Sequence, residues 1–327
     1  NCNYRVVYAH PRACHGGDIF KLHIFRNGQA YYSQPQGKNI KMPALIDILK
    51  KSEEFLRKKN ISNPRFEAEC ILTKVLECKR IDLYLRYMEK LSVEQLNDIK
   101  ILLTRRANHE PLQYIIGKWP FHDLTLNLDS CALIPRPETE ELVEILIKKF
   151  SQYKNARLSI LDLGTGSGAI ALSLARFFQK SHTCASDYSS ETLSLARENA
   201  AANSIQSITF AKSDWFSNIF GSFDLIASNP PYLSEEEWEQ CQPEIKFFEP
   251  KLALCAGDGG KADLLKIIDQ SPRFLKANGV LALETGETQH QAVFEFAKEN
   301  FQLAESIRDS SQRNRFIVLS RPKTKIV

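Results

Sequence analysis

The chain has 327 residues, which exceeds a typical single domain, and its 43% hydrophobic and 25% charged residues are the composition of a globular protein. The net charge of +4 is only a weak indication of a nucleic-acid partner, and no apolar run reaches the roughly 18 residues of a membrane span. We therefore expect no direct binding to nucleic acid or to a membrane. The eight cysteines form no C-x-x-C pair and have no histidine at ligand spacing, which argues against a metal site or a disulfide framework. This usage indicates a reducing compartment, which we expect to be the cytoplasm or, as the alternative, the mitochondrial matrix.

Residues 1–41 form a basic segment in which Asp18 is the single acid and no helical or strand period is sustained. An acid-poor, basic segment is typical of a transit peptide, but the stretch 31–37 is not amphipathic. We interpret 1–41 as an N-terminal extension of unclear role, either a targeting or processed segment or an extension unrelated to function.

Residues 42–110 carry apolar side chains at spacings of three and four, which predicts a small helical bundle. Pro64 is expected at the first position of one helix, and Ser92 with Gln95 predicts a capping box at the start of another. The charges are interleaved, as on a solvated surface, and do not form a phosphate-binding face. The pattern leaves two roles open, the docking of a protein partner and a packing lid.

Residues 111–137 change to an alternating pattern, over 119–128 and again over 131–135, with Asp129-Ser130 between the two runs. This pattern predicts a β-hairpin linker. A helix is expected from Arg136 to about Phe150, with acidic residues favourably placed in its first turn.

Residues 138–327 alternate between strand and helix patterns. Strands are expected at 158–163, 183–186, 207–211, 223–227, 280–284 and 316–320. Such alternation predicts an α/β domain with a doubly wound, mostly parallel, Rossmann-like sheet. Ligands of these sheets bind at the carboxyl ends of the strands, so we expect the functional residues there.

A glycine-rich turn follows the first of these strands and consists of Gly164, Thr165, Gly166, Ser167 and Gly168. Glycines at alternate positions let the backbone approach a ligand closely, and the helix behind them offers free N–H groups. The dinucleotide fingerprint G-x-G-x-x-G is absent, which favours a nucleoside ligand other than a nicotinamide cofactor.

The next two strands end in Asp187 and in Asp214-Trp215. Asp187 is placed either to bind the hydroxyls of a ribose or to cap the following helix. Trp215 is either a flat apolar surface for an adenine or a core residue. The fourth strand ends in Asn229-Pro230-Pro231-Tyr232, where two prolines stop strand pairing. An amide oxygen, the carbonyl of Pro230 and an aromatic ring suit a planar NH2 group; a packed Pro-Pro turn is the alternative.

Further motifs accompany these strand ends in the same order along the chain. They are Glu110-Pro111-Leu112-Gln113-Tyr114-Ile115, Ile134-Pro135-Arg136-Pro137-Glu138-Thr139-Glu140, Glu249-Pro250 and Gly257-Asp258-Gly259. With them, the chain after residue 42 resembles the class I S-adenosylmethionine-dependent methyltransferases. It resembles more closely the HemK/PrmC family of protein-(glutamine-N5) methyltransferases. The resemblance implies a helical substrate-docking domain at 42–110, a hairpin linker at 111–137 and a methyltransferase domain at 138–327.

The same resemblance implies transfer of a methyl group from S-adenosylmethionine to the glutamine of the Gly-Gly-Gln motif in class 1 peptide chain release factors. The turn 164–168, Asp187, Trp215 and Asn229 would then bind the cofactor. Asn229 and Pro230 would hold the substrate amide, together with Pro231 and Tyr232, and Phe121 would lie beside the methyl group. Arg136 and Glu138 are expected to be anchors, and 309–315 receives no role.

Two other functions are compatible with the same residues. A nucleic-acid amino methyltransferase acting on adenine N6 or cytosine N4 would also use Asn-Pro-Pro-Tyr, but it usually needs a positive surface or a base-flipping device. A cofactor-binding scaffold without catalysis is the other alternative, against which the intact motifs argue.

Overall fold

The computed structural model describes residues 42–323, and the predicted extension over 1–41 lies outside them. Within 42–323, none of the helices combines the length and the apolar composition that a membrane crossing requires. The first part of this region is helical, as predicted. Its helices are α1 (Leu45–Lys58), α2 (Pro64–Leu76), α3 (Asp82–Leu85), α4 (Val93–Ala107) and α5 (Leu112–Ile116).

Both predicted helix starts in this bundle are confirmed. Pro64 is the first residue of α2, where its missing N–H costs nothing. Ser92 caps α4 by accepting a hydrogen bond from the Gln95 N–H, and the Gln95 side chain in turn accepts from the Ser92 N–H. The apolar residues at helical spacing form one buried cluster, which contains Leu49, Leu56 and Leu72.

A β-hairpin follows, but its turn lies earlier than predicted. Strand β1 (Lys118–Phe121) pairs antiparallel with β2 (Leu124–Asn127), so the turn is His122-Asp123 and residues 131–135 form no strand. His122 adopts left-handed backbone with φ of 51°, which closes the two-residue turn, and its N–H donates to Glu140 Oε1 at 3.0 Å. The predicted turn at Asp129 is a local one, in which its carboxylate accepts from the Cys131 N–H at 2.9 Å.

Two asparagines bind the backbone of β2: Asn199 lies in α8 (Ser190–Ala202), and Asn203 is the residue that follows this helix. Asn199 accepts from the Asn127 N–H at 2.6 Å and donates to the Asn127 carbonyl at 3.1 Å. Asn203 makes the same pair of bonds with Thr125, at 3.2 and 2.9 Å. The spacing suits both elements, because four residues of helix rise about 6 Å and two residues of strand rise about 6.8 Å.

The rest of the chain forms a seven-stranded sheet in the order β5-β4-β3-β6-β7-β9-β8. Its strands are β3 (Ser159–Leu163), β4 (His182–Asp187), β5 (Ile208–Lys212), β6 (Phe223–Ser228), β7 (Leu275–Glu284), β8 (Phe301–Arg308) and β9 (Asn314–Pro322). The first five in spatial order run parallel, and β9 lies antiparallel between β7 and β8. The predicted doubly wound, mostly parallel sheet is confirmed. Strand β8 was not predicted.

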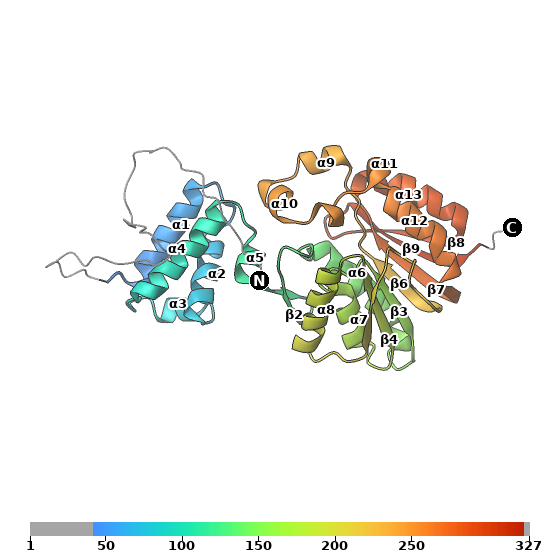
Figure 1. Cartoon of the computed structure of the whole chain (residues 1–327), viewed down its shortest axis with the longest axis horizontal. Coiled ribbons are helices and arrows are strands. Elements are labelled where there is room, and N and C mark those ends of the chain that lie inside the picture. Colours follow the sequence, from blue (N-terminus) through green and yellow to red (C-terminus); the bar gives the residue numbers. More distant parts are fainter. Residues whose placement is uncertain (1–41, 324–327) are drawn as a thin grey trace, which may run out of the picture. The chain divides into compact units, whose positions relative to one another are not determined.

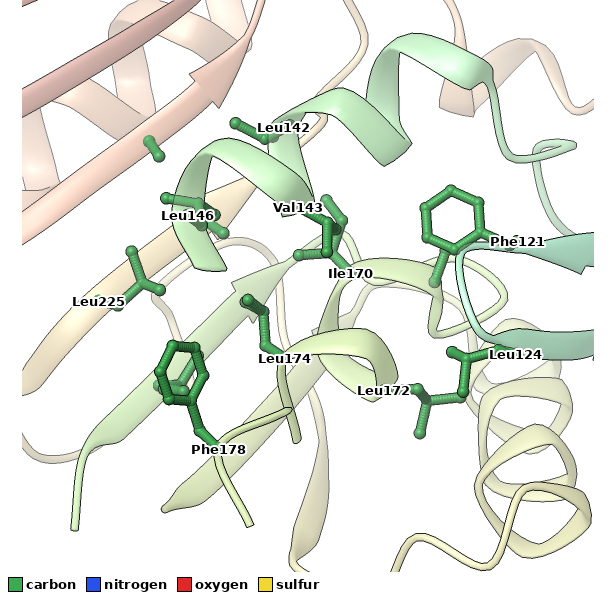
Figure 2. Packing of buried hydrophobic residues seen from close by; sticks show 14 of the residues in the cluster. Phe121, Leu124, Leu142, Val143, Leu146, Ile170, Leu172, Leu174, Phe178 and Leu225 are labelled. Carbon is green, nitrogen blue, oxygen red and sulfur yellow. The ribbon is translucent and has the colours of Figure 1, made fainter. Parts of the chain in front are cut away.

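Helices cover both faces of this sheet (Figure 1). The chain leaves β3 toward β4 and β5 on one side and returns to β6 on the other, so the strand order reverses beside β3. Alternate residues of each strand enter different cores: Ile160 and Leu225 pack with α6 (Pro137–Phe150) and α7 (Ala169–Phe177), as Figure 2 shows for Leu225. Their neighbours Leu161 and Ile226 pack with α12 (Ala262–Gln270) and α13 (Glu287–Asn300). The reversal of order places a crevice at the carboxyl ends of β3 and its neighbours.

Candidate active site

A cavity of about 570 Å³ lies at the carboxyl ends of β3, β4, β5 and β6. Its wall includes residues from all four predicted strand ends, among them Gly166, Asp187, Trp215 and Asn229. The volume is in the range of sites that enclose a small organic molecule. The strand ends that the sequence singled out therefore do meet at one place.

The glycine-rich turn is shaped by a buried acid that the sequence analysis did not identify. Asp162, fully buried in β3, accepts hydrogen bonds from the Thr165 hydroxyl at 2.6 Å and from the Ala171 N–H at 3.0 Å. Burial raises the pKa of its carboxyl to about 7 against the lowering effect of these two bonds. Asp162 thus ties the turn, through Thr165, and the start of α7, through Ala171, to β3. The available signal was the position of this acid inside the first predicted strand.

Gly166 and Gly168 need the conformational freedom of glycine in this turn. Their φ angles are +57° and +90°, which L side chains rarely adopt. A Cβ at 166 would meet nothing within 4 Å, whereas one at 168 would come within 2.9 Å of Leu172 Cδ1. Gly166 therefore leaves open space at the cavity wall, and Gly168 allows the turn to pack against α7.

Asp187 joins the second strand to this turn. Its Oδ2 accepts from the Gly166 N–H and its Oδ1 from the Ser189 N–H, both at 3.0 Å. Burial raises the pKa of the carboxyl, and these backbone donors oppose that rise. The side chain that caps α8 is Ser189, which accepts from the Thr192 N–H at 3.1 Å. Each oxygen of Asp187 keeps a further lone pair for a hydroxyl in the cavity.

Trp215 is half-buried and lines the cavity. Its indole N–H donates to Asp263 Oδ1 at 2.9 Å, which fixes the ring orientation, and its Cζ3 would lie 3.4 Å from a Cβ on Gly164. The ring therefore lies against the start of the turn and forms part of the cavity wall. A nucleoside has the planar base and the hydroxyls that Trp215 and Asp187 suit, so the residues present fit the S-adenosylmethionine that the resemblance implies.

The four residues of the Asn-Pro-Pro-Tyr segment after β6 do not all line the cavity. Asn229 and Pro231 line the cavity, Pro230 is buried, and Tyr232 is half-buried against the apolar cluster around α12 and α13. The Asn229 side chain donates through Nδ2 to the Thr139 hydroxyl at 3.0 Å. Among residues 42–323, none donates a hydrogen bond to the Pro230 carbonyl or to Asn229 Oδ1. Both acceptors are therefore without a donor among these residues, and Asn229 is the one of the two residues that lines the cavity.

Glu284 at the end of β7 connects the two ends of this segment and was missed by the sequence analysis. It is fully buried, and its Oε2 accepts from the Thr139 hydroxyl at 2.7 Å. Its Oε1 accepts from the Tyr232 hydroxyl at 3.1 Å. The available signal was the acid at the end of a predicted strand, next to the already noted 136–140 motif that contains Thr139.

The flanking charged residues act as anchors. Arg136 donates to Glu249 Oε1 at 2.5 Å, and the same buried carboxylate accepts from the Ile134 N–H at 3.1 Å. Glu138 pairs with Arg313 at 2.8 Å. The segment 309–315, which received no role, continues this network through Asp309, which accepts from Arg313 Nε at 2.9 Å.

Phe121 is not brought to the cavity. Its ring is 2% exposed and belongs to the buried cluster that contains Val143 and Ile170 (Figure 2). It is absent from the residues that line the cavity. The alternation that places Phe121 on the inner face of β1 directs its ring into the core, so it supports the wall from behind.

Two family models match parts of the described chain. Residues 47–117 match the family model of the PrmC N-terminal domain, and residues 139–245 match that of the methyltransferase small domain. The catalytic domain of hMettl16, solved with MAT2A 3'UTR hairpin 6, matches with a TM-score of 0.50. It is 16% identical over 69% of this chain and 83% of that chain, which shows a shared fold.

Curated relatives match over most of their length. The release factor glutamine methyltransferase of Fusobacterium nucleatum is 34% identical over 84% of this chain and 78% of the relative. Those of Buchnera aphidicola subsp. Schizaphis graminum and Lactococcus lactis are 40% and 41% identical, over 77% and 72% of this chain and 91% and 86% of the relatives. The chain therefore belongs to the release factor glutamine methyltransferase family, whose methyl donor is S-adenosylmethionine.

Proposed function

We propose that this protein methylates the side-chain amide nitrogen of the glutamine in the Gly-Gly-Gln motif of class 1 peptide chain release factors. The observation that carries the proposal is the orientation of Asn229. Its NH2 group is bound to Thr139, so its Oδ1 is free beside a cavity that suits S-adenosylmethionine. Membership of the family supports the choice of substrate. Bacterial relatives and the scattered cysteines support the cytoplasm as the compartment.

The proposed chemistry must overcome the weak nucleophilicity of an amide nitrogen. S-Adenosylmethionine supplies a methyl group on a positively charged sulfur. The amide nitrogen is a poor nucleophile because its lone pair is delocalised into the carbonyl, and positive charge grows on it as the new N–C bond forms. Asn229 Oδ1 and the Pro230 carbonyl would accept its two hydrogens, and these bonds strengthen as that charge grows. As this bond forms, the bond between the methyl group and sulfur breaks and its electron pair stays on sulfur. One of the two protons on the nitrogen then passes to solvent, which restores a neutral amide.

Tyr232 and the rigid Pro230-Pro231 pair would supply orientation. Two consecutive prolines fix their own φ angles, so the acceptors of this segment are held before substrate arrives. Tyr232 is tied to Glu284 by its hydroxyl, which limits rotation of its ring. Fixed orientation of reacting groups contributes up to about 7–11 kcal/mol of barrier reduction in favourable cases.

We propose that residues 42–110 dock the release factor. Near α3 this region exposes several large apolar side chains, including Ile81 at 61%, Leu85 at 75% and Met88 at 67%. Several large exposed apolar side chains this close together in the sequence support an interaction site. The double variant Leu85→Ser with Met88→Ser should raise KM for the release factor and leave kcat unchanged; an unchanged KM would contradict this role.

The decisive experiment is mass spectrometry of a purified release factor after incubation with the protein and S-adenosylmethionine. We expect one added methyl group on the glutamine of Gly-Gly-Gln, and its loss with Asn229→Ala. Retained S-adenosylmethionine binding in that variant would show that the fold survives. Methyl label that enters DNA or RNA in the same mixture, with none on the release factor, would overturn the proposal.

A further inference from the structure

Glu284 is a buried acid that does not line the cavity but is linked to both ends of the Asn-Pro-Pro-Tyr segment, to Tyr232 directly and to Asn229 through Thr139. One oxygen accepts from Thr139 at 2.7 Å and the other from Tyr232 at 3.1 Å. Thr139 in turn accepts from Asn229 Nδ2 at 3.0 Å. Three elements far apart in sequence, the start of α6, the end of β7 and the turn after β6, therefore meet in one hydrogen-bonded chain.

The direction of each bond in this chain follows from the count of hydrogens. The Thr139 hydroxyl carries one hydrogen, and an ionised carboxylate only accepts. When Glu284 is ionised, Thr139 must give its hydrogen to Glu284. It can then bind Asn229 only as an acceptor, so the Asn229 NH2 turns toward it and the Asn229 carbonyl oxygen turns away.

We propose that Glu284 is a positioning residue whose negative charge, relayed through Thr139, sets which end of the Asn229 amide faces the substrate. The inference rests on the proposed function, since it concerns how Asn229 is made an acceptor for the substrate N–H. Asparagine is ambiguous by itself, because its two ends have nearly the same shape and opposite hydrogen-bonding character. The relay removes that ambiguity before substrate binds.

Protonation of Glu284 reverses the relay. A protonated carboxyl can donate to Thr139, and Thr139 is then free to donate its own hydrogen to the Asn229 carbonyl oxygen. The Asn229 amide turns over and presents its NH2, which cannot accept a substrate N–H. Activity should therefore depend on the ionisation of Glu284.

Burial of Glu284, more than the charges around it, places its pKa near neutral pH. Burial raises the pKa of its carboxyl to about 7, and the neighbouring acid Glu138 acts in the same direction. The hydrogen bonds from Thr139 and Tyr232 and the positive charge of Arg315 oppose this rise. Arg315 is itself paired with Asp309 at 3.7 Å.

One further titratable group packs nearby. His290 of α13 contacts the Thr285 hydroxyl at 2.7 Å, and burial followed by the charge of Arg315 lowers the pKa of its ring to about 4. It is therefore neutral where Glu284 titrates. We expect the kcat of the wild type to fall about tenfold per pH unit below about pH 7, because one proton inactivates the relay.

The test compares Thr139→Val with Thr139→Ser, which differ in the hydroxyl that the relay needs. Val keeps the shape of Thr and removes the hydroxyl, so kcat should drop at least about tenfold. The variant should also lose the acid limb, which is the fall of kcat as the pH drops below about 7. Ser keeps the hydroxyl and should recover most of the lost kcat together with the acid limb. Glu284→Gln should behave as Thr139→Val does, because its pH-independent amide cannot act as a switch. S-Adenosylmethionine affinity, measured by calorimetry, should stay within about threefold in all variants.

The results separate this inference from the function on which it rests. Wild-type kcat with an intact acid limb in Thr139→Val overturns the relay, as does a wild type without an acid limb. A wild type that methylates no release factor overturns the proposed function, and the relay is then tested by NMR. The side-chain NH2 resonances of Asn229 should titrate with an apparent pKa that disappears in Glu284→Gln. Resonances that do not move with pH in the wild type overturn the relay by this second route.

Discussion

Gly166 and Gly168 differ in what lies beyond their missing Cβ atoms, and alanine substitutions should expose that difference. Both positions have left-handed backbone, where an L side chain costs about 1–2 kcal/mol. Alanine also stiffens the unfolded chain and so returns about 0.4–1 kcal/mol at each position. These two contributions are common to both variants, so they cancel in the comparison.

What does not cancel is the contact at position 168. Its Cβ would lie 2.9 Å from Leu172 Cδ1 and 3.2 Å from Leu172 Cγ, and Leu172 is fully buried and cannot move aside freely. Overpacking of this kind costs about 1–3 kcal/mol. We expect Gly166→Ala to lower the free energy of unfolding by about 1 kcal/mol and Gly168→Ala by about 2–4 kcal/mol.

Urea unfolding of the two variants measures these values, and calorimetry with S-adenosylmethionine adds an independent comparison. The methyl group at 166 enters open space at the cavity wall, so we expect Gly166→Ala to lose more affinity although it loses less stability. Equal destabilisation by the two substitutions would refute the packing argument. Unchanged affinity in Gly166→Ala would refute the assignment of the turn to the cofactor.

Three further predictions concern stability. Phe178 is fully buried, so Phe178→Ala should cost about 3–5 kcal/mol in urea unfolding and Phe178→Leu clearly less; equal losses would contradict a cavity effect. Asn199→Ala removes two part-buried bonds to the Asn127 backbone, so it should cost about 2–3 kcal/mol and speed hydrogen exchange of the Asn127 amide. Unchanged exchange would show that β2 is held by other contacts. Burial opposes ionisation of Asp309, but Arg313 and Arg315 hold the pKa of its carboxyl below the ordinary 3.8. Its stabilisation is therefore present above pH 3.8 and lost as the pH falls through the lower folded value, so the deficit of Asp309→Asn should shrink from neutral pH to about pH 3.

The sequence was sufficient for the parts of the fold that repeat a simple pattern. Buried parallel strands read as apolar runs, and the polar residues that stop them lie at one edge of the sheet, which is why Gly166, Asp187 and Asn229 could be placed together. Strand β8 escaped prediction because it is an edge strand with mostly exposed residues and no apolar alternation. The hairpin turn was misplaced because Asp129-Ser130 is a strong turn signal, while His122 takes left-handed backbone without a glycine or asparagine to announce it.

The sequence predicted residues that line the cavity but not the buried contacts behind them. Thr139 and Glu284 are 145 residues apart, and their hydrogen bond depends on how α6 packs against β7. No local pattern encodes such a contact. Phe121 shows the opposite limit, since an aromatic residue next to a predicted site can serve the core behind it.

The two asparagines that bind β2 fix the register of the hairpin relative to α8. Residues 199 and 203 grip backbone positions 125 and 127, so a slip of the hairpin by one residue would present side chains of the wrong face and leave all four bonds unmade. The Asn199 amide also donates to the Ser167 carbonyl of the glycine-rich turn at 2.9 Å. The Asn199 side chain therefore fixes both the register of the hairpin and the position of the glycine-rich turn relative to α8. A ligand that reduces the motion of the turn would therefore also reduce the motion of the hairpin, because both are bonded to the Asn199 amide. This coupling needs no change in the mean structure.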